Sequence, residues 1–189
     1  IESGPSIQAT LSGSGAYGIR ISGVANVTLQ SLKVQGFSVD SLKLVNVANA
    51  VIRANVLTGA GSGAVDAQDC PSLQLLNNSL APSAGTAALI NRCDGAVVQG
   101  NQVPSSSAPS YGLVLQNSAN AWMTSNRADN ADYAFNLYSS NSVTVTGNVA
   151  MGRGKQRGLV LDNSSGFRIL RNLLVGQVVG MELASSPSG

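Results

Sequence analysis

The chain has 189 residues, of which 43% are hydrophobic and 11% are charged, and its formal net charge is +2. This length suits one domain, and the composition is too apolar for a disordered chain. The small net charge gives no strong field to attract nucleic acid or anionic lipid, and no apolar run has the length of a membrane span. The sequence contains no histidine, which excludes Ser/His and Cys/His nucleophile pairs and histidine-based zinc sites.

One pattern recurs eight times along the chain: a small residue, then alternating apolar and variable residues. The copies start at intervals of 22 to 25 residues, at Gly18, Ser41, Ala64, Ala87, Gly112, Ala134, Gly158 and Gly180. Alternation with a period of two predicts a strand with one buried face. Self-similarity at a fixed period indicates a repeat architecture.

Each copy continues with two shorter apolar segments that are separated by a polar column. The first copy has Val27 and Leu29 in its second segment and Val34 in its third. One position between these segments is leucine in the first copy, at Leu32, and asparagine in the later copies. These asparagines are Asn55, Asn78, Asn101, Asn126, Asn148 and Asn172. Asparagine tolerates the left-handed backbone of a tight bend, so we expect these residues to adopt it. We also expect their amides to hydrogen-bond between neighbouring coils as a ladder.

Three short strands in each unit of 22 to 25 residues predict one turn of a parallel β-helix. We therefore predict an all-β, single-stranded solenoid of about seven to eight coils. Lengths vary mainly after the third strand, where loops that carry function tend to lie. We expect a single domain over residues 1–189, and the abrupt start at Ile1 leads us to expect a fragment of a longer chain.

First strands of the Gly-Ile-x-Leu type, the segment Asn141-Ser-Val-Thr-Val-Thr-Gly-Asn148 and the asparagine column resemble the right-handed parallel β-helix superfamily, the pectate-lyase-like fold. The resemblance covers residues 17–184 and implies right-handed coils. The superfamily contains polysaccharide lyases, glycosidases, sugar epimerases, phage tailspikes, adhesins and periplasmic repeat proteins. The resemblance therefore implies a fold more specifically than a function.

The two cysteines, Cys70 and Cys93, fall in one column of small residues that we expect to point inward. Stacked positions lie within disulfide range, so free buried thiols and a disulfide between coils both remain open. A catalytic thiol is not expected, because no histidine is present to activate it.

Two carboxylates, Asp162 and Glu182, are candidates for catalysis. Coil geometry places them diagonally on adjacent coils, roughly 8 Å apart at Cα. This spacing is compatible with an acid and a base on either side of a water molecule in inverting glycoside hydrolysis. The alternative is that both are solvated surface acids. On the same face Lys43 and Asp66 are stacked opposite charges, which predicts a surface ion pair.

The candidate substrate-binding residues are aromatic and basic: Tyr111, Tyr133, Tyr138, Arg153, Lys155 and Arg157. Tyr111 and Tyr133 should stack on adjacent coils, and Arg157 follows in the same column. Aromatic faces are platforms for sugar rings, and arginine can cover such a stack. The cations could neutralise sugar carboxylates, which favours an acidic glycan. The alternatives are an aromatic stack that only stabilises the solenoid and a solvated basic loop.

Our first functional hypothesis is a carbohydrate-directed β-helix that binds or cleaves a polysaccharide or cell-surface glycan, with lyase or glycoside hydrolase chemistry if it is an enzyme. The alternative is a non-catalytic structural shaft or adhesin-like repeat segment. We expect no cofactor, no metal and no nucleic acid partner, and a location that is extracellular, periplasmic or in a phage virion. An outward Trp122 suggests a covered face, which could meet another subunit of a homo-oligomer such as a trimer or a further part of a longer parent chain.

Overall fold

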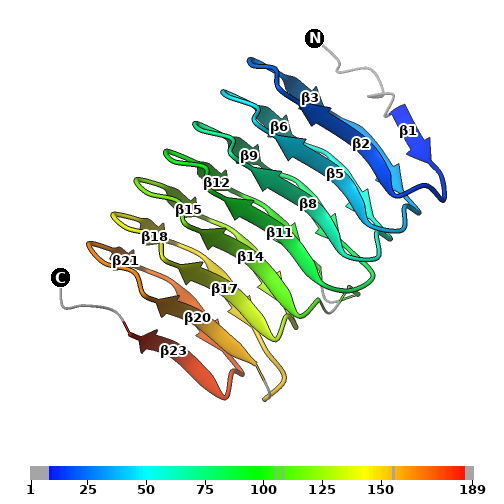
Figure 1. The fold of residues 1–189 in the computed structure, drawn as a ribbon. Helices are drawn as coiled ribbons and strands as arrows, with labels where there is room; N and C mark the ends of the chain where they lie inside the picture. The colour runs from blue at the N-terminus through cyan, green and yellow to red at the C-terminus, as the bar shows by residue number, and fades with distance from the viewer. Residues whose placement is uncertain (1–8, 105, 108, 155, 186–189) are drawn as a thin grey trace, which may run out of the picture.

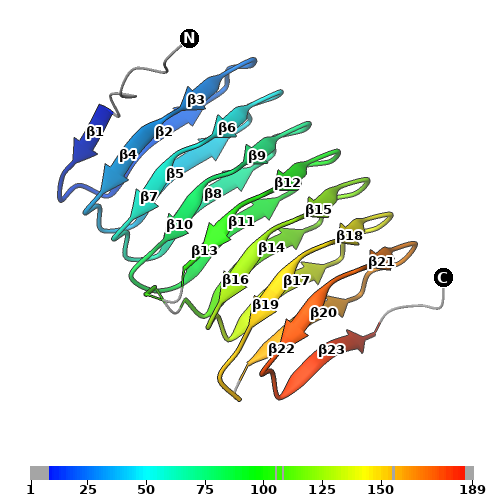
Figure 2. The same ribbon diagram turned by 180° about the vertical axis from the view of Figure 1, so that it is seen from behind.

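A computed structural model describes residues 9–104, 106–107, 109–154 and 156–185. Within these ranges the chain forms 23 strands and no helix. All strand pairs are parallel, and the strands form three sheets that wind together as a solenoid (Figures 1 and 2). The prediction of an all-β parallel β-helix is confirmed. No helix in the described ranges has the length and apolar character needed to cross a membrane.

The sheet with the longest strands, called here the long sheet, has eight strands of six residues each. They are β2 (Tyr17–Ser22), β5 (Asp40–Val45), β8 (Gly63–Gln68), β11 (Thr86–Asn91), β14 (Tyr111–Gln116), β17 (Tyr133–Tyr138), β20 (Arg157–Asp162) and β23 (Val179–Ala184). Figure 1 shows this sheet facing the viewer, with one strand contributed by each successive coil.

The other two sheets consist of shorter strands. The second contains β3 (Thr28–Gln30), β6 (Val51–Arg53), β9 (Gln74–Leu76), β12 (Val97–Gln99), β15 (Trp122–Thr124), β18 (Thr144–Thr146) and β21 (Arg168–Leu170). The third contains β1 (Ala9–Ser12), β4 (Leu32–Gln35), β7 (Val56–Thr58), β10 (Ser79–Ala81), β13 (Gln102–Val103), β16 (Arg127–Asp129), β19 (Val149–Met151) and β22 (Leu173–Val175). Connections after the third sheet vary most, from residues 176–178 to residues 104–110, as the sequence predicts.

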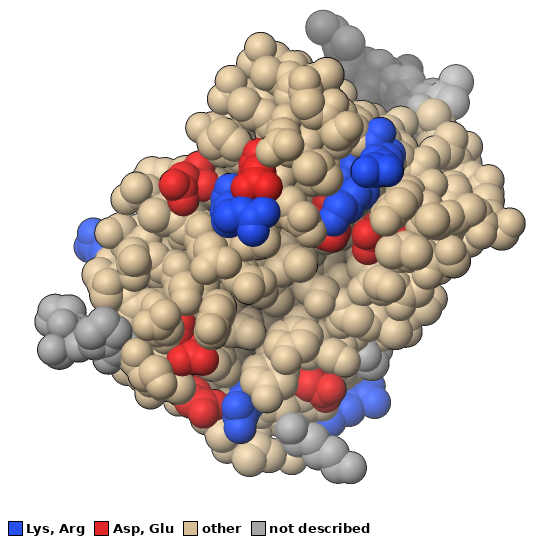
Figure 3. Space-filling view, viewed as in Figure 1, with Lys and Arg blue, Asp and Glu red and all other residues tan. Residues whose placement is uncertain are grey.

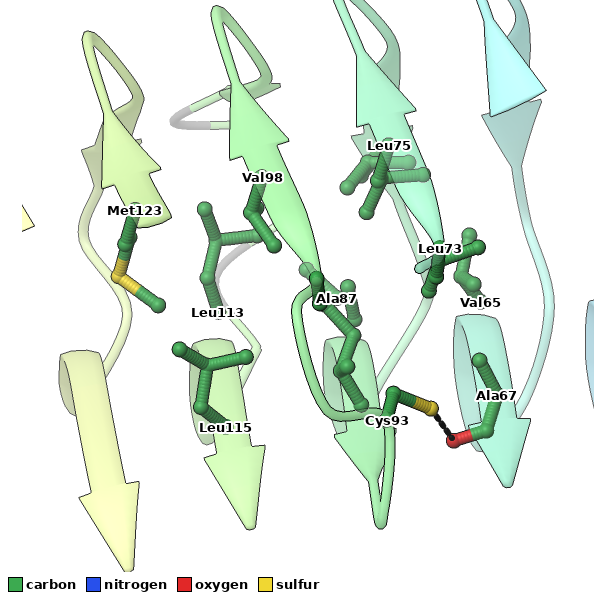
Figure 4. Close-up of a cluster of buried hydrophobic side chains, with 14 of the residues drawn as sticks. Val65, Ala67, Leu73, Leu75, Ala87, Cys93, Val98, Leu113, Leu115 and Met123 are labelled. Atoms are coloured by element: carbon green, nitrogen blue, oxygen red, sulfur yellow. Dashed lines mark hydrogen bonds between the residues drawn. The ribbon is translucent and has the colours of Figure 1, made fainter. Parts of the chain in front are cut away.

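The core is a narrow column of small and medium aliphatic side chains between the three sheets. Figure 4 shows Leu113 and Leu115 of the long sheet next to Val98 and Met123 of the second sheet. All four are 0% exposed. The end coils have a neighbour on one side only, and Leu183 in the last coil is accordingly 53% exposed.

The asparagine column forms a continuous buried ladder, which confirms this part of the prediction. The Oδ1 atom of Asn101 accepts hydrogen bonds from the backbone N–H and the Nδ2 of Asn78, at 2.9 and 3.0 Å. Its own Nδ2 donates to the carbonyl of Leu75 at 2.7 Å and to Oδ1 of Asn126 at 3.0 Å. The same pattern repeats from Asn55 to Asn172 and ends on the backbone N–H of Leu32.

The expectation that the ladder asparagines adopt a left-handed backbone is wrong. The positive φ belongs to the residue before each of them, as at Ala54 (54°), Asn77 (54°) and Gly100 (68°). The preceding residue turns the chain, which leaves the asparagine side chain directed inward, where its amide can reach both neighbouring coils. The ladder position therefore selects asparagine for its hydrogen-bonding groups and not for its backbone preference.

Both cysteines are free, and both are 0% exposed. The backbone N–H of Cys70 points at Sγ of Cys93 at 3.3 Å, and the backbone N–H of Cys93 donates to Oγ of Ser118 at 3.0 Å. Cysteine and serine thus occupy equivalent positions in a second, smaller ladder. Of the two alternatives that the sequence leaves open, the structure has the buried free thiols.

We predict that Asn101→Ala lowers the free energy of unfolding by about 2–4 kcal/mol, because it leaves the buried N–H of Asn78 and the carbonyl of Leu75 without their partner. Urea unfolding followed by circular dichroism measures the loss. Gln102→Ala is the matched control, since Gln102 follows in the same coil with an exposed side chain. Equal stability of the two variants would contradict the role of the ladder.

We predict that neither thiol of the folded chain reacts with a water-soluble disulfide reagent, because a thiolate must contact the reagent and both sulfurs are buried. Both should react once the chain is unfolded in concentrated guanidinium chloride. Absorbance of the released thiol gives the count in each state. Rapid reaction of the folded chain would show that the core opens readily at these coils.

Candidate functional site

The outer face of the long sheet is a grid of three columns, because each coil stacks in register on the next. The start column contains Tyr17, Asp40, Gly63, Thr86, Tyr111, Tyr133, Arg157 and Val179. The middle column contains Arg20, Lys43, Asp66, Leu89, Val114, Asn136, Val160 and Glu182. The end column contains Ser22, Val45, Gln68, Asn91, Gln116, Tyr138, Asp162 and Ala184.

A hollow of about 360 Å³ lies on this grid over β11, β14 and β17. Tyr111 and Tyr138 line it together with the apolar Leu89 and Val114. Its polar lining groups are Thr86, Gln116 and Asn136. Figure 3 shows this face, with uncharged surface in the middle and charged side chains toward both ends.

A smaller hollow of about 130 Å³ continues the first toward the N-terminal coils. It is lined by Asp40, Ser62, Gly63, Val65, Asp66, Thr86 and Leu89. Thr86 and Leu89 belong to both hollows, so the two form one shallow depression that crosses the strands from β5 to β17. We call this depression, with the residues of both hollows, the outer groove.

The predicted aromatic stack is present at the C-terminal end of the outer groove. The ring centroids of Tyr111 and Tyr133 are 4.9 Å apart, with 19° between the ring planes. The guanidinium of Arg157 lies 5.2 Å from the ring centroid of Tyr133, and its Nη1 donates to the Tyr133 hydroxyl at 3.4 Å. The stack therefore presents one tyrosine toward the groove and is covered by arginine at its far end.

Glu182, one of the two predicted catalytic carboxylates, is held by an ion pair. Its Oε2 lies 3.0 Å from Nη1 of Arg157. The strand register pairs Glu182 with Val160 and Ala184 with Asp162, so Glu182 and Asp162 do lie diagonally on adjacent coils as expected. Their catalytic role stays a prediction, and the arginine that neutralises Glu182 favours a structural part for that carboxylate.

The remaining predicted binding residues lie at two different edges of the sheet. Tyr138 ends β17, is 43% exposed and forms a wall of the larger hollow. Arg153 is exposed in the loop between β19 and β20, where its backbone N–H donates to Oε1 of the buried Gln156 at 2.7 Å. Lys155 lies outside the described residues.

The sequence prediction missed the acidic end of the groove. Lys43 and Asp66 pair as predicted, but their side chains are only 14% and 19% exposed, so this is a largely buried ion pair and not a surface one. Gln68 adds to it, since its Nε2 donates to both oxygens of Asp66 at 3.2 and 3.3 Å. Two carboxylates, Asp66 and Asp40, lie near Lys43, and the ammonium group of Lys43 forms its ion pair with Asp66.

The second carboxylate, Asp40, is 5% exposed, and none of the described residues donates a hydrogen bond to it. Burial raises the pKa of Asp40 from its usual 3.8 to about 6, the negative charge of Asp66 adds to the rise, and Lys43 opposes it. The signal that could have identified it is its column, where Asp40 stands next to a position without a side chain, Gly63.

This grid and groove define a parallel β-helix protein with an aromatic, amide and carboxylate surface on one sheet. The chain belongs to the NosD family, because the family model described as "Periplasmic copper-binding protein (NosD)" matches residues 6–188. The comparison with curated proteins gives no significant match.

Among solved structures, the chain is similar to the A-module of the mannuronan C-5 epimerase AlgE4 from Azotobacter vinelandii, with a TM-score of 0.55 and 9% sequence identity. The match covers 94% of this chain and 62% of that module, so it shows a shared fold only. A second match is the pentapeptide repeat protein HetL from the cyanobacterium Nostoc, with 11% identity over 90% of this chain and 89% of that one. Its TM-score of 0.20 is too low to indicate a shared fold.

We predict that Asp40→Asn stabilises the chain at neutral pH by about 1–3 kcal/mol. The folded state has the higher pKa, so it binds more protons than the unfolded state between about pH 4 and pH 6, and wild-type stability falls as the pH rises through this window. Urea unfolding across that range measures the effect, which should vanish at the acidic end. Asp132→Asn, at an exposed aspartate, should leave the profile unchanged.

Proposed function

We propose that the outer groove binds carbohydrate. The observation that carries this proposal is the hollow in which Tyr111 and Tyr138 stand beside an apolar floor and the amides of Gln116 and Asn136. Sugar rings combine apolar C–H faces with a rim of hydroxyl groups. Tyrosine rings suit the faces, and side-chain amides can both donate to and accept from the hydroxyls.

The ligand that we propose is an extended glycan with acidic groups at the C-terminal end of the groove. The exposed Arg153 supplies positive charge there, while Arg157, which is paired with Glu182, covers the tyrosine stack. The fold shared with a mannuronan C-5 epimerase module supports carbohydrate at the level of the fold alone. Polysaccharide cleavage by Asp162 and Glu182 remains a prediction.

We propose a periplasmic location, which the description of the family supports. The structure adds no observation in favour of a phage virion. Association into a homo-oligomer also stays a prediction, for which the exposure of Trp122, at 48%, is the supporting feature.

The residues of this chain do not fit the copper that the family description names. Copper is bound by thiolate, thioether and imidazole ligands. The sequence has no histidine, and its three methionines, Met123, Met151 and Met181, lie in β15, β19 and β23 of three different sheets. Cys70 and Cys93 are fully buried, and their thiols point at backbone carbonyl oxygens of Gln68 and Asn91. Within the described ranges there is no group of three or more Cys, Asp or Glu side chains arranged to hold a metal ion.

The alternative function, a structural shaft or adhesin-like segment, is supported by the regular coils and the continuous asparagine ladder. It differs from the first proposal in one respect that can be measured. A shaft needs no affinity for glycans in solution, whereas the groove proposal requires it.

We predict that Tyr138→Ala weakens glycan binding by up to about tenfold, since an aromatic contact contributes up to about 1.5 kcal/mol and a tenfold change corresponds to about 1.4 kcal/mol. Binding is measured on an array of neutral and uronate oligosaccharides. Tyr17→Ala is the matched control, because Tyr17 is an exposed tyrosine of the start column that does not line the groove. If the wild-type chain binds no glycan on the array, the proposal is wrong and the structural alternative stands.

A further inference from the structure

The N-terminal end of the outer groove contains a carboxylate whose hydrogen-bonding capacity is unused. An ionised carboxylate can accept about four hydrogen bonds, yet within the described ranges no donor lies on the side chain of Asp40. A buried polar group without a partner costs stability. Asp40 lines the smaller hollow, so a donor that enters the groove can reach it.

The hollow exists because Gly63 follows Asp40 in the start column. A Cβ atom on Gly63 would lie 3.0 Å from Oδ1 of Asp40 and 3.0 Å from the carbonyl oxygen of Thr86. No other position of this column is glycine; apart from Asp40 itself, the remaining positions are tyrosine, threonine, arginine and valine. The missing side chain therefore leaves room for the carboxylate of Asp40, which lines the smaller hollow beside Gly63.

The charges around Asp40 determine which kind of ligand can donate hydrogen bonds to its carboxylate. Lys43 on the same strand is paired with Asp66 on β8, which leaves the carboxylate pair with one cation. On β2, Tyr17 is the register neighbour of Asp40, and Arg20 packs on Tyr17 with its guanidinium 5.8 Å from the ring centroid. This surplus of negative charge disfavours a sugar carboxylate, while uncharged hydroxyl groups can donate to both oxygens of Asp40.

We propose that the end of the outer groove over Gly63 is a binding subsite for a neutral sugar, with Asp40 as the acceptor for its hydroxyl groups. The subsite rests on the proposed carbohydrate binding and extends it. It is joined to the tyrosine hollow through Thr86 and Leu89. From β5 to β17 the groove crosses four coil steps, about 19 Å, so one oligosaccharide can occupy both ends.

Hydroxyl donation favours the ionised carboxylate, so binding at this subsite is linked to pH. With a pKa of about 6, the ionised fraction of Asp40 rises about tenfold between pH 5 and pH 7. The affinity for a neutral oligosaccharide should therefore rise by up to about tenfold over this interval. Asp40→Asn removes the titrating group and should make the affinity independent of pH.

The experiment measures binding of neutral and uronate oligosaccharides to the wild type, Asp40→Asn and Gly63→Ala at about pH 5 and about pH 7. Asp94→Asn, at an exposed aspartate on the bend after β11, is the matched control. Circular dichroism verifies that each variant is folded. We expect a pH-dependent affinity for neutral oligosaccharides in the wild type and the control, a constant affinity in Asp40→Asn, and weaker binding by Gly63→Ala at both pH values.

Equal binding of neutral oligosaccharides by wild type and Asp40→Asn at both pH values would overturn the subsite. Binding of uronates alone would overturn it as well. In either case carbohydrate binding at the tyrosine hollow would stand, provided that Tyr138→Ala weakens it. Absence of all binding would overturn both proposals together.

Discussion

The register between neighbouring coils is the constraint on which the other features of the structure depend. Parallel backbone pairing alone allows a strand to slip, and a slip of one residue exchanges its inner and outer faces. The asparagine ladder opposes such a slip, because each amide bonds to backbone groups of another coil at one fixed bend. Residues about two dozen positions apart are thus held as neighbours, and the three outer columns follow directly.

The sequence predicts most of this architecture because the repeat is local, regular and expressed in residue type. The alternating strands, the asparagine column and the Tyr111–Tyr133 stack follow from the spacing alone. The left-handed residue before each ladder asparagine could not be predicted in the same way. At Ala54, Ser125 and Arg171 its identity varies, so no residue type marks it.

The acidic end of the groove was missed for a different reason. Asp40 is one aspartate among several in the sequence, and the single feature of the repeat pattern that distinguishes it is Gly63 at the same position of the next coil. Its properties come from two neighbours on the next coil: Gly63 contributes no side chain, and Asp66 takes the cation of Lys43. The burial of Asp40 that results from these neighbours is a property of the folded chain, and a pattern of residue types does not contain it.

The stacking of the coils also fixes the distance between the two ends of the outer groove. Because each coil advances the solenoid by one strand spacing, about 4.8 Å, duplication of a single repeat between β8 and β11 would move the acidic end away from the tyrosines by one step. Neither end would need to be rebuilt. A lineage with this fold could therefore match ligands of different length by gaining or losing whole coils, while single substitutions in the columns adjust the chemistry of each step.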